Sequence, residues 1–283
     1  MNFLYPILAA ILQSGSFTLD KVVLSLKHIT FQTYTGISFP LSFAITFIIF
    51  LIFEPPLFSQ ELFAGNLFFL ITLSVIIKII TNLIFYRALH DDHLAEIQTL
   101  ELLPRFSVLL GSSIFFADER NYFIVFPSFI ATFAVIWSHF KHHHFHIAKH
   151  TAPFLIWSVI SAPIDAAILK TLLMTWNPIS LELIRSAMMA LVLFPLFSKH
   201  TENISGKAML LFILTNTLSC VAWILFYTSY QHSGIIYTLL LFSIQPLLVY
   251  FAAVIFLKDK LEFKKTVAFF VVLVSIIIAQ VAG

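Results

Sequence analysis

One face of an apolar segment carries side chains that could bind a solute. In residues 63–87, Lys78, Asn82 and Tyr86 are spaced i, i+4 and i+8, so a helix would present them on one face. A charged group at the centre of a bilayer costs at least ~3 kcal/mol, so this face should meet protein or a water-filled cavity. We expect Lys78 to bind a carboxylate or phosphate group of the solute.

A second polar face lies in residues 93–116. Gln98, Glu101 and Arg105 fall within about 60° of one another on a helix with about 100° per residue. Glu101 could take and release a proton, since a poorly hydrated cavity disfavours the charged form of a carboxyl group. Arg105 could bind a solute anion in place of Lys78. The alternative is a structural ion pair or triad of Lys78, Glu101 and Arg105.

Two further apolar segments carry candidate solute contacts. Asp165 stands alone in the middle of residues 152–172, where it could exchange a proton or meet an amine. In residues 207–230, Trp223 and Tyr227 could pack against the apolar part of a solute, with a cation–π contact at Trp223. These residues complete the set that we expect to line a central cavity.

The first and the seventh apolar segments also carry polar and charged residues. Gln13, Ser16 and Asp20 share one face of the first apolar segment and should also line the cavity. Glu182 and Arg185 stand at i and i+3 near the start of the seventh apolar segment, and we expect them to pair structurally.

Two prolines interrupt apolar segments at similar depths. Pro104 has no N–H and its ring crowds the carbonyl of Leu100, so a helix should kink or break there. Pro246 lies at nearly the same depth of residues 234–257. Such breaks could expose carbonyls to a solute site. The alternative is a packing kink, which neighbouring helices tolerate by satisfying the freed backbone groups.

The composition is that of an integral membrane protein. The chain is 60% hydrophobic and 11% charged, against about 25% charged residues in soluble domains. Its net charge of +2 offers no basic face for nucleic acid. Backbone in lipid must satisfy its own hydrogen bonds, so we expect an all-α fold. Ten segments approach the roughly 20 apolar residues that a span needs: 3–19, 32–53, 63–87, 93–116, 121–138, 152–172, 177–197, 207–230, 234–257 and 264–282.

Charged and turn-forming residues should occupy the short connections between these segments. The first connection would hold Asp20 and Lys21. Lysines and arginines in the other connections favour both termini outside the cell by the positive-inside rule. The localisation that we expect is a multi-pass protein of the bacterial cytoplasmic (inner) membrane.

The sequence also repeats itself at a distance of 141 residues. Gly65 falls on Gly206 and Asp118 on Asp259, without a gap from residue 65 to about 137. Five spans per half is an odd number, so the halves must enter the membrane in opposite orientations. We therefore predict ten transmembrane helices as two inverted five-helix repeats, residues 1–138 and 152–283, as in many secondary transporters.

The linker at residues 139–151 is the most polar part of the chain. His142, His146 and His150 are spaced i, i+4 and i+8, and a helix with that spacing could bind a transition metal. No Cys, Asp or Glu lies in the linker. We therefore expect a solvated linker, no metal site and no cofactor.

Several motifs recur at matching places of the two halves. In the first half they are Phe85-Tyr86-x-Ala88-Leu89, Leu103-Pro104 and Asp118-Glu119-Arg120; in the second they are Phe226-Tyr227, Gln245-Pro246 and Lys258-Asp259-Lys260. This pattern resembles the EamA-type members of the drug/metabolite transporter superfamily. Lys21 and Lys170 also resemble a basic position of that family, whereas Lys260 departs from the family-like Glu119.

The resemblance implies a secondary transporter that works by alternating access. Its solutes would be small metabolites such as amino acids, exported or exchanged, with proton coupling as one option. Relatives also carry nucleotide sugars and sugar phosphates, so these, or a lipid-linked sugar, are the alternative solutes. Family members usually keep both termini in the cytoplasm, opposite to the orientation that the loop charges favour.

Other classes of membrane protein fit the sequence less well. There is no GxxxxGK motif, so the chain is not itself an ATPase, and no HExxH motif of a metalloprotease. A non-transporting scaffold or sensor would explain the spans but not the charged faces. The expected partners are therefore a small-molecule solute and the lipid bilayer.

Overall fold

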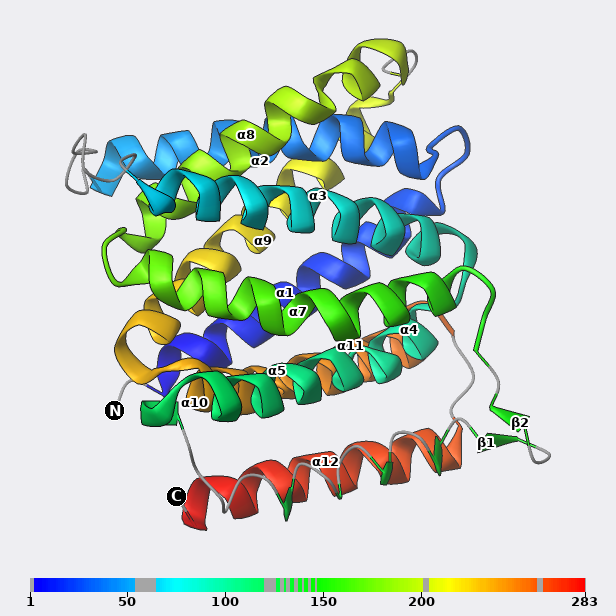
Figure 1. Ribbon diagram of the computed structural model, residues 1–283. Helices are drawn as coiled ribbons and strands as arrows, with labels where there is room; N and C mark the ends of the chain where they lie inside the picture. Colours follow the sequence, from blue (N-terminus) through cyan, green and yellow to red (C-terminus); the bar gives the residue numbers. More distant parts are fainter. Residues whose placement is uncertain are drawn as a thin grey trace.

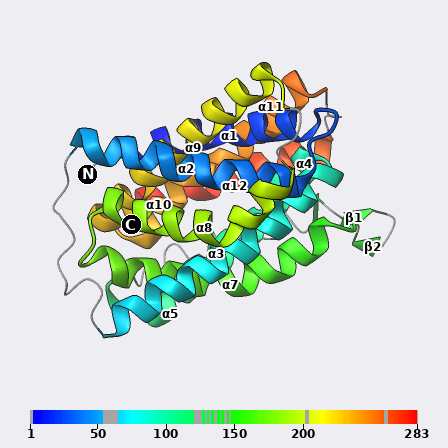
Figure 2. The ribbon, with the colours of Figure 1, turned by 90° about the horizontal axis from the view of Figure 1, so that it is seen from above.

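The fold is a bundle of long helices, shown in Figure 1 as a computed structural model. The structure describes residues 3–53, 65–119, 126–127, 130, 133–134, 137–138, 140–141, 144–145, 147–200, 204–258 and 262–282. Both ends of the chain lie at the same end of the bundle (Figure 1 and Figure 2).

The described elements of the first half are α1 (Leu4–Leu24), α2 (Phe31–Phe53), α3 (Asn66–Asp91), α4 (Leu94–Leu100), α5 (Leu102–Phe115) and the short 3₁₀ helix η2 (Ala117–Glu119). Those of the second half are α7 (Thr151–Leu173), α8 (Pro178–His200), α9 (Gly206–Ser233), α10 (Ile235–Phe242), α11 (Ile244–Phe256) and α12 (Phe263–Ala282). The helical fold class is therefore confirmed. The expected span at 121–138 lies largely outside the described residues.

Apolar side chains point outward and polar ones inward. Ile48, Phe69 and Leu191 are 56%, 65% and 76% exposed, whereas Gln98 and Thr215 are fully buried. A soluble protein would bury such large apolar residues, but in a membrane they contact lipid tails. Within the described residues, seven helical segments are long and apolar enough to cross a membrane, when α10 and α11 are counted together as one.

Helices of the two halves pack against each other in reciprocal pairs. α1 packs on α9 and α3 on α7, while α2 packs on α8. In a duplicated chain α1 would correspond to α7 and α3 to α9, so the first two pairs would be equivalent contacts. The packing fits a repeat, and the inverted ten-helix arrangement stays a prediction.

The first connection was predicted wrongly. α1 does not end before Asp20 and Lys21 but continues to Leu24. Both residues are stabilised within the helix by tertiary contacts. Asp20 is buried against other helices, and the Lys21 ammonium binds carbonyls at the end of α3, 2.6 Å from Leu89 O and 2.8 Å from Asp92 O. Cationic groups stabilise helix C-termini in this way.

Two expected spans are each divided into two helices. α4 ends at Leu100 and α5 begins at Leu102, while α10 and α11 meet at Ser243. Pro104 and Pro246 are each the third residue of the new helix. Proline is tolerated there because the N–H groups of a first helical turn have no intrahelical partner.

The described part of the linker contains a short strand pair and then a turn that leads into α7. β1 (Phe140–Lys141) and β2 (His144–Phe145) form a two-residue antiparallel pair. His139, His142, His143 and His146 lie outside the described residues, as does Arg120. His150 lies at the start of α7, with Nε2 3.6 Å from Asp91 Oδ2.

Candidate functional site

A cavity of about 240 Å³ lies between helices of both halves. Most of the predicted site residues line it: Lys78, Asn82, Tyr86, Glu101, Pro104, Arg105, Asp165 and Trp223. Gln98, Tyr227 and Pro246 are instead buried among the helices and do not line it. The polar faces that helical spacing indicated are thus brought together in one place.

Lys78 is held by an aromatic ring and not by a carboxylate. Its ammonium lies 3.7 Å from the centre of the Trp223 ring, a cation–π contact. Among the described residues no salt bridge or hydrogen bond to Lys78 is found. The alternative triad with Glu101 and Arg105 is therefore not formed, and the Lys78 ammonium faces the cavity with its hydrogen-bonding capacity unused.

Arg105 binds protein groups in the second half of the chain. Nη1 donates to Phe242 O, the last carbonyl of α10, at 2.8 Å, and Nη2 donates to Gln245 Oε1. Gln245 Nε2 in turn donates to Gln98 Oε1 at 3.0 Å. Gln98 on α4 and Arg105 on α5 thus stabilise the interruption between α10 and α11. This makes Arg105 a poorer solute anchor than Lys78.

Glu101 makes one long contact with Arg105. The Arg105 Nη2 atom lies 3.4 Å from Glu101 Oε1, as the i, i+4 spacing predicts. Glu101 Oε2 is sealed from solvent and has no hydrogen-bond partner in the described part of the chain. A solute in the cavity therefore does not contact this oxygen.

Asp165 belongs to an ion-paired network between helices. Arg185 Nη2 on α8 lies 3.4 Å from Asp165 Oδ2, and Ser74 Oγ on α3 donates to Oδ1. Arg185 Nη1 donates to the Tyr227 hydroxyl on α9. The expected pairing of Glu182 with Arg185 is wrong, because the guanidinium turns to Asp165 and Tyr227 instead. An arginine inside an apolar span was the signal that could have placed Arg185 in the site.

Asp20 was predicted on the cavity face but omitted from the strongest candidates. It lines the cavity and is 2% exposed. Its Oδ1 atom accepts hydrogen bonds from the Tyr34 hydroxyl of α2 and the Thr215 hydroxyl of α9. The sequence marked it as a connection residue because it precedes Lys21 at the end of an apolar run.

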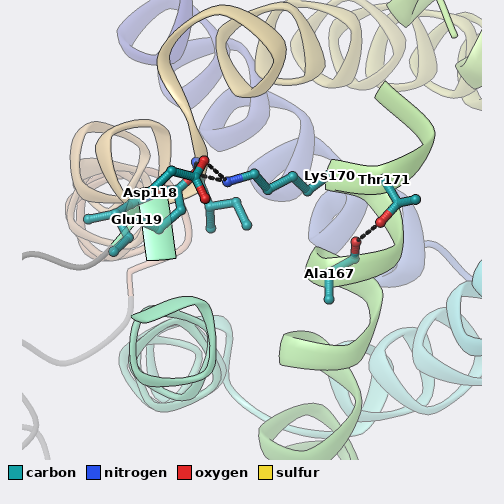
Figure 3. Close-up of polar contacts among 7 residues, drawn as sticks. Asp118, Glu119, Ala167, Lys170 and Thr171 are labelled. Carbon is teal, nitrogen blue, oxygen red and sulfur yellow. Dashed lines mark hydrogen bonds and ion pairs between the residues drawn. The ribbon is translucent and has the colours of Figure 1, made fainter. Parts of the chain in front are cut away.

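Beyond the cavity, an acidic cluster joins three helices at the left end of the bundle in Figure 1. Lys170 Nζ on α7 lies 2.6 Å from Asp118 Oδ2 and 2.8 Å from Glu119 Oε1, as Figure 3 shows. Glu119 also accepts from the N–H groups of Ile235 and Ile236 at 2.8 and 3.1 Å, capping the N-terminus of α10. The hydrogen bond from Lys170 holds the pKa of Asp118 below its ordinary value.

The comparisons with known proteins agree with this architecture. Residues 151–280 match the EamA-like transporter family. The resemblance predicted from the motifs is thereby confirmed for the second half of the chain. With the seven apolar helices, the match shows a multi-pass membrane protein with an EamA-like transporter region, and members of this family are transporters and not enzymes.

The match to solved structures extends over both halves. A structure titled only "Crystal structure of protein" is similar with a TM-score of 0.69 and 12% sequence identity. The similarity covers 98% of this chain and 96% of that chain, so the whole length adopts a known fold. A comparison with curated proteins finds no match.

Proposed function

We propose that this EamA-like chain is a secondary transporter of small organic solutes, such as amino acids or related compounds, and that the cavity is its solute site. The observation that carries the proposal is the composition of the cavity wall. Charged and polar groups from both halves converge on this cavity between apolar helices. Intramembrane ionisable residues that face a cavity are typical of solute and ion pathways.

Lys78 is the proposed anchor for an anionic group of the solute. The two basic residues lining the cavity, among those described, are Lys78 and Arg105. Arg105 already donates hydrogen bonds to Glu101, Gln245 and Phe242 O. Among the described residues the Lys78 ammonium contacts the face of Trp223 alone, and this ring can also pack against the apolar part of the solute.

Glu101 is the proposed proton-exchanging carboxylate. Its sealed oxygen can hold a proton, and Arg105 lies close enough to stabilise the charged form when the proton leaves. Asp165 fits this role less well, because Arg185 and Ser74 already hold both its oxygens.

Alternating access would move one half against the other. The interruptions at Glu101 and Ser243 provide places where the broken helices can bend. Two sets of contacts lie at opposite ends of the bundle. The contacts of Lys170 with the acidic cluster are at the left in Figure 1, and those of Lys21 with the end of α3 are at the right. We propose that access alternates between these ends by loosening one set of contacts at a time, in export or exchange.

The membrane and orientation follow the same reasoning. We propose the bacterial cytoplasmic membrane, with both termini outside as the loop charges favour. Fusing a periplasm-active and a cytoplasm-active reporter to the C-terminus tests this. Activity of the cytoplasmic reporter alone would contradict the proposed orientation.

The test of transport compares metabolites inside and outside cells by untargeted mass spectrometry. Wild type, Lys78→Met, Glu101→Gln and an empty vector are expressed at equal levels. Lys207→Met serves as a control, because Lys207 is an exposed lysine on the same helix as Trp223. We expect a small set of compounds to be redistributed by wild type and Lys207→Met but not by the two cavity variants.

Two results would count against the proposal. Redistribution unaffected by Lys78→Met and Glu101→Gln would remove these charges from the transport mechanism. A wild-type profile identical to that of the vector on several carbon and nitrogen sources would contradict transport itself.

A further inference from the structure

Asp20 is a cavity-lining carboxylate without a salt-bridge partner among the described residues. Asp20 accepts hydrogen bonds from two hydroxyl groups, Tyr34 and Thr215, and both donate to the same oxygen, Oδ1. No described residue donates to Oδ2. The neighbouring Lys21 does not help, since its ammonium binds backbone carbonyls at the end of α3.

An incompletely satisfied buried carboxylate is costly unless a further donor binds it. Burial removes the water that would solvate the charge, and two neutral hydroxyls on one oxygen compensate only part of this loss. Glu101 Oε2, by comparison, is sealed as well as unpartnered. Asp20 lines the cavity, so a ligand in the cavity can approach its carboxylate.

The surroundings of Asp20 suit a positively charged group. The Tyr34 and Tyr86 rings pack at a tilt beside it, with centroids 4.6 Å apart, and aromatic faces attract cations. Ser16 and Asn216 add hydroxyl and amide oxygens to the same wall. Ammonium groups have only donors, so they pair well with such a set of acceptors.

The charge of the whole cavity points the same way. Within the part of the chain that the structure describes, four carboxylates line the cavity, Asp20, Glu101, Asp165 and Glu182. They outnumber by one the basic residues Lys78 and Arg105 of the lining together with Arg185, which pairs with Asp165. A cavity with this excess of acid is suited to a solute that brings at least one positive charge.

We propose that Asp20 forms a subsite for a protonated amine of the solute, with Oδ2 as the acceptor. This inference rests on the proposed transport function and assigns a new role within its cavity. Lys78 and Asp20 would then bind opposite charges, and a sugar phosphate without an amine would leave the Asp20 subsite empty.

Purified full-length protein in detergent tests the subsite through ligand-induced thermal stabilisation. The probes are 2-phenylethylamine against 2-phenylethanol and butylamine against butanol, pairs that differ only in the amine. Since a hydrogen bond to a charged group is worth about 1.5–3 kcal/mol, wild type should bind each amine about tenfold or more tightly than its alcohol.

Asp20→Asn should abolish the preference for the amine. The variant keeps an acceptor for Tyr34 and Thr215 but loses the charge, so it separates ligand binding from folding. Asp91→Asn is the matched control, because Asp91 lies at the end of α3 outside the cavity lining, and it should keep the preference. Equal binding of amine and alcohol by wild type, or an unchanged preference in Asp20→Asn, would overturn the proposal.

The metabolite comparison separates failure of the subsite from failure of transport. Redistribution only of compounds that lack an amine would overturn the Asp20 subsite and leave transport intact. Selective amine binding that depends on Asp20, in a protein that redistributes nothing, would support the subsite and contradict transport. Loss of proton coupling in Asp20→Asn without any amine preference would assign Asp20 to the proton and overturn the amine subsite.

Discussion

Asp20 and Asp165 lie at similar positions in the two halves but have different partners. Each lies on the first helix of its half and accepts a hydrogen bond from a hydroxyl on the third helix of the other half, Thr215 or Ser74. These two hydroxyl residues are separated by the 141-residue repeat distance. Asp165 also has Arg185, whereas Asp20 has only hydroxyl partners among the described residues.

The difference arises on the second helix of each half. Arg185 is the eighth residue of α8, and the eighth residue of α2 is Ser38. Ser38 lines the cavity and accepts from Asn216 Nδ2 at 3.3 Å, so it supplies no charge to Asp20. One half therefore compensates its buried carboxylate internally, and the other leaves that task to a ligand. We therefore expect substitutions at the Asp165 pair to change mainly stability, and substitutions at Asp20 to change mainly ligand binding.

The largest expected effect is on Arg185. Arg185→Met leaves Asp165 without its cation in a buried site, which should lower the free energy of unfolding by about 3 kcal/mol. Thermal unfolding of the purified protein measures this loss. The double variant Arg185→Met/Asp165→Asn removes both charges and should recover much of it. A single variant as stable as wild type would break the comparison.

The next effect compares the two carboxylates directly. Asp165→Asn should cost about 1.5–3 kcal/mol, because it strands the buried guanidinium of Arg185. Asp20→Asn should stay within ~1 kcal/mol of wild type, because no cation loses its partner and Asn still accepts from both hydroxyls. Paired unfolding curves of the two variants decide this. Equal losses at both sites would show that Asp20 is also a structural residue.

A smaller effect is expected at Gly234, the residue that precedes α10. Gly234 has φ +83°, and a Cβ there would lie 2.8 Å from Glu119 Oε1. Gly234→Ala should cost about 1–2 kcal/mol through backbone strain and displacement of this cap. Gly206→Ala provides the control, since a Cβ on Gly206 has no atom within 4 Å. A similar melting temperature for both variants would contradict the close packing of Glu119 against Gly234.

The smallest effect concerns the pH dependence of Asp118. Lys170 lowers the pKa of this carboxyl from its ordinary value of 3.8, so the ion pair contributes stability above that pH. The contribution is lost as the pH falls below 3.8 through the lowered folded-state pKa. The side chain is 70% exposed, so the gain should be well under ~1 kcal/mol. Asp118→Asn should therefore be slightly less stable than wild type at pH 7 and equal to it at low pH.

Much of the cavity could be predicted because helical phase is a local property. The spacing of Lys78, Asn82 and Tyr86 puts them on one side of α3 whatever the helix packs against. The cost of a charge in lipid then requires that side to face inward. The same local rules predicted the apolar helices and the interruptions near the two prolines.

Partner choice could not be predicted, because it depends on helix rotation and depth. Arg105 has the expected Glu101 one turn away, yet its stronger contacts are Gln245 and the Phe242 carbonyl on another helix. Arg185 likewise passes over Glu182 for Asp165. Contacts between residues on different helices, 20 positions apart for Arg185 and more than a hundred for Arg105, leave no pattern in local spacing.

The sequence by itself determined that this protein is a helical membrane protein and which faces of its helices are polar. Only the tertiary structure decided which buried charges are paired. Asp20 shows the reason: its helix continues past the point where the apolar run ends, and three helices from both halves must meet before its lack of a cation becomes visible. A charge is neutralised by what lies within a few ångströms in space, and sequence spacing fixes that only within one helix.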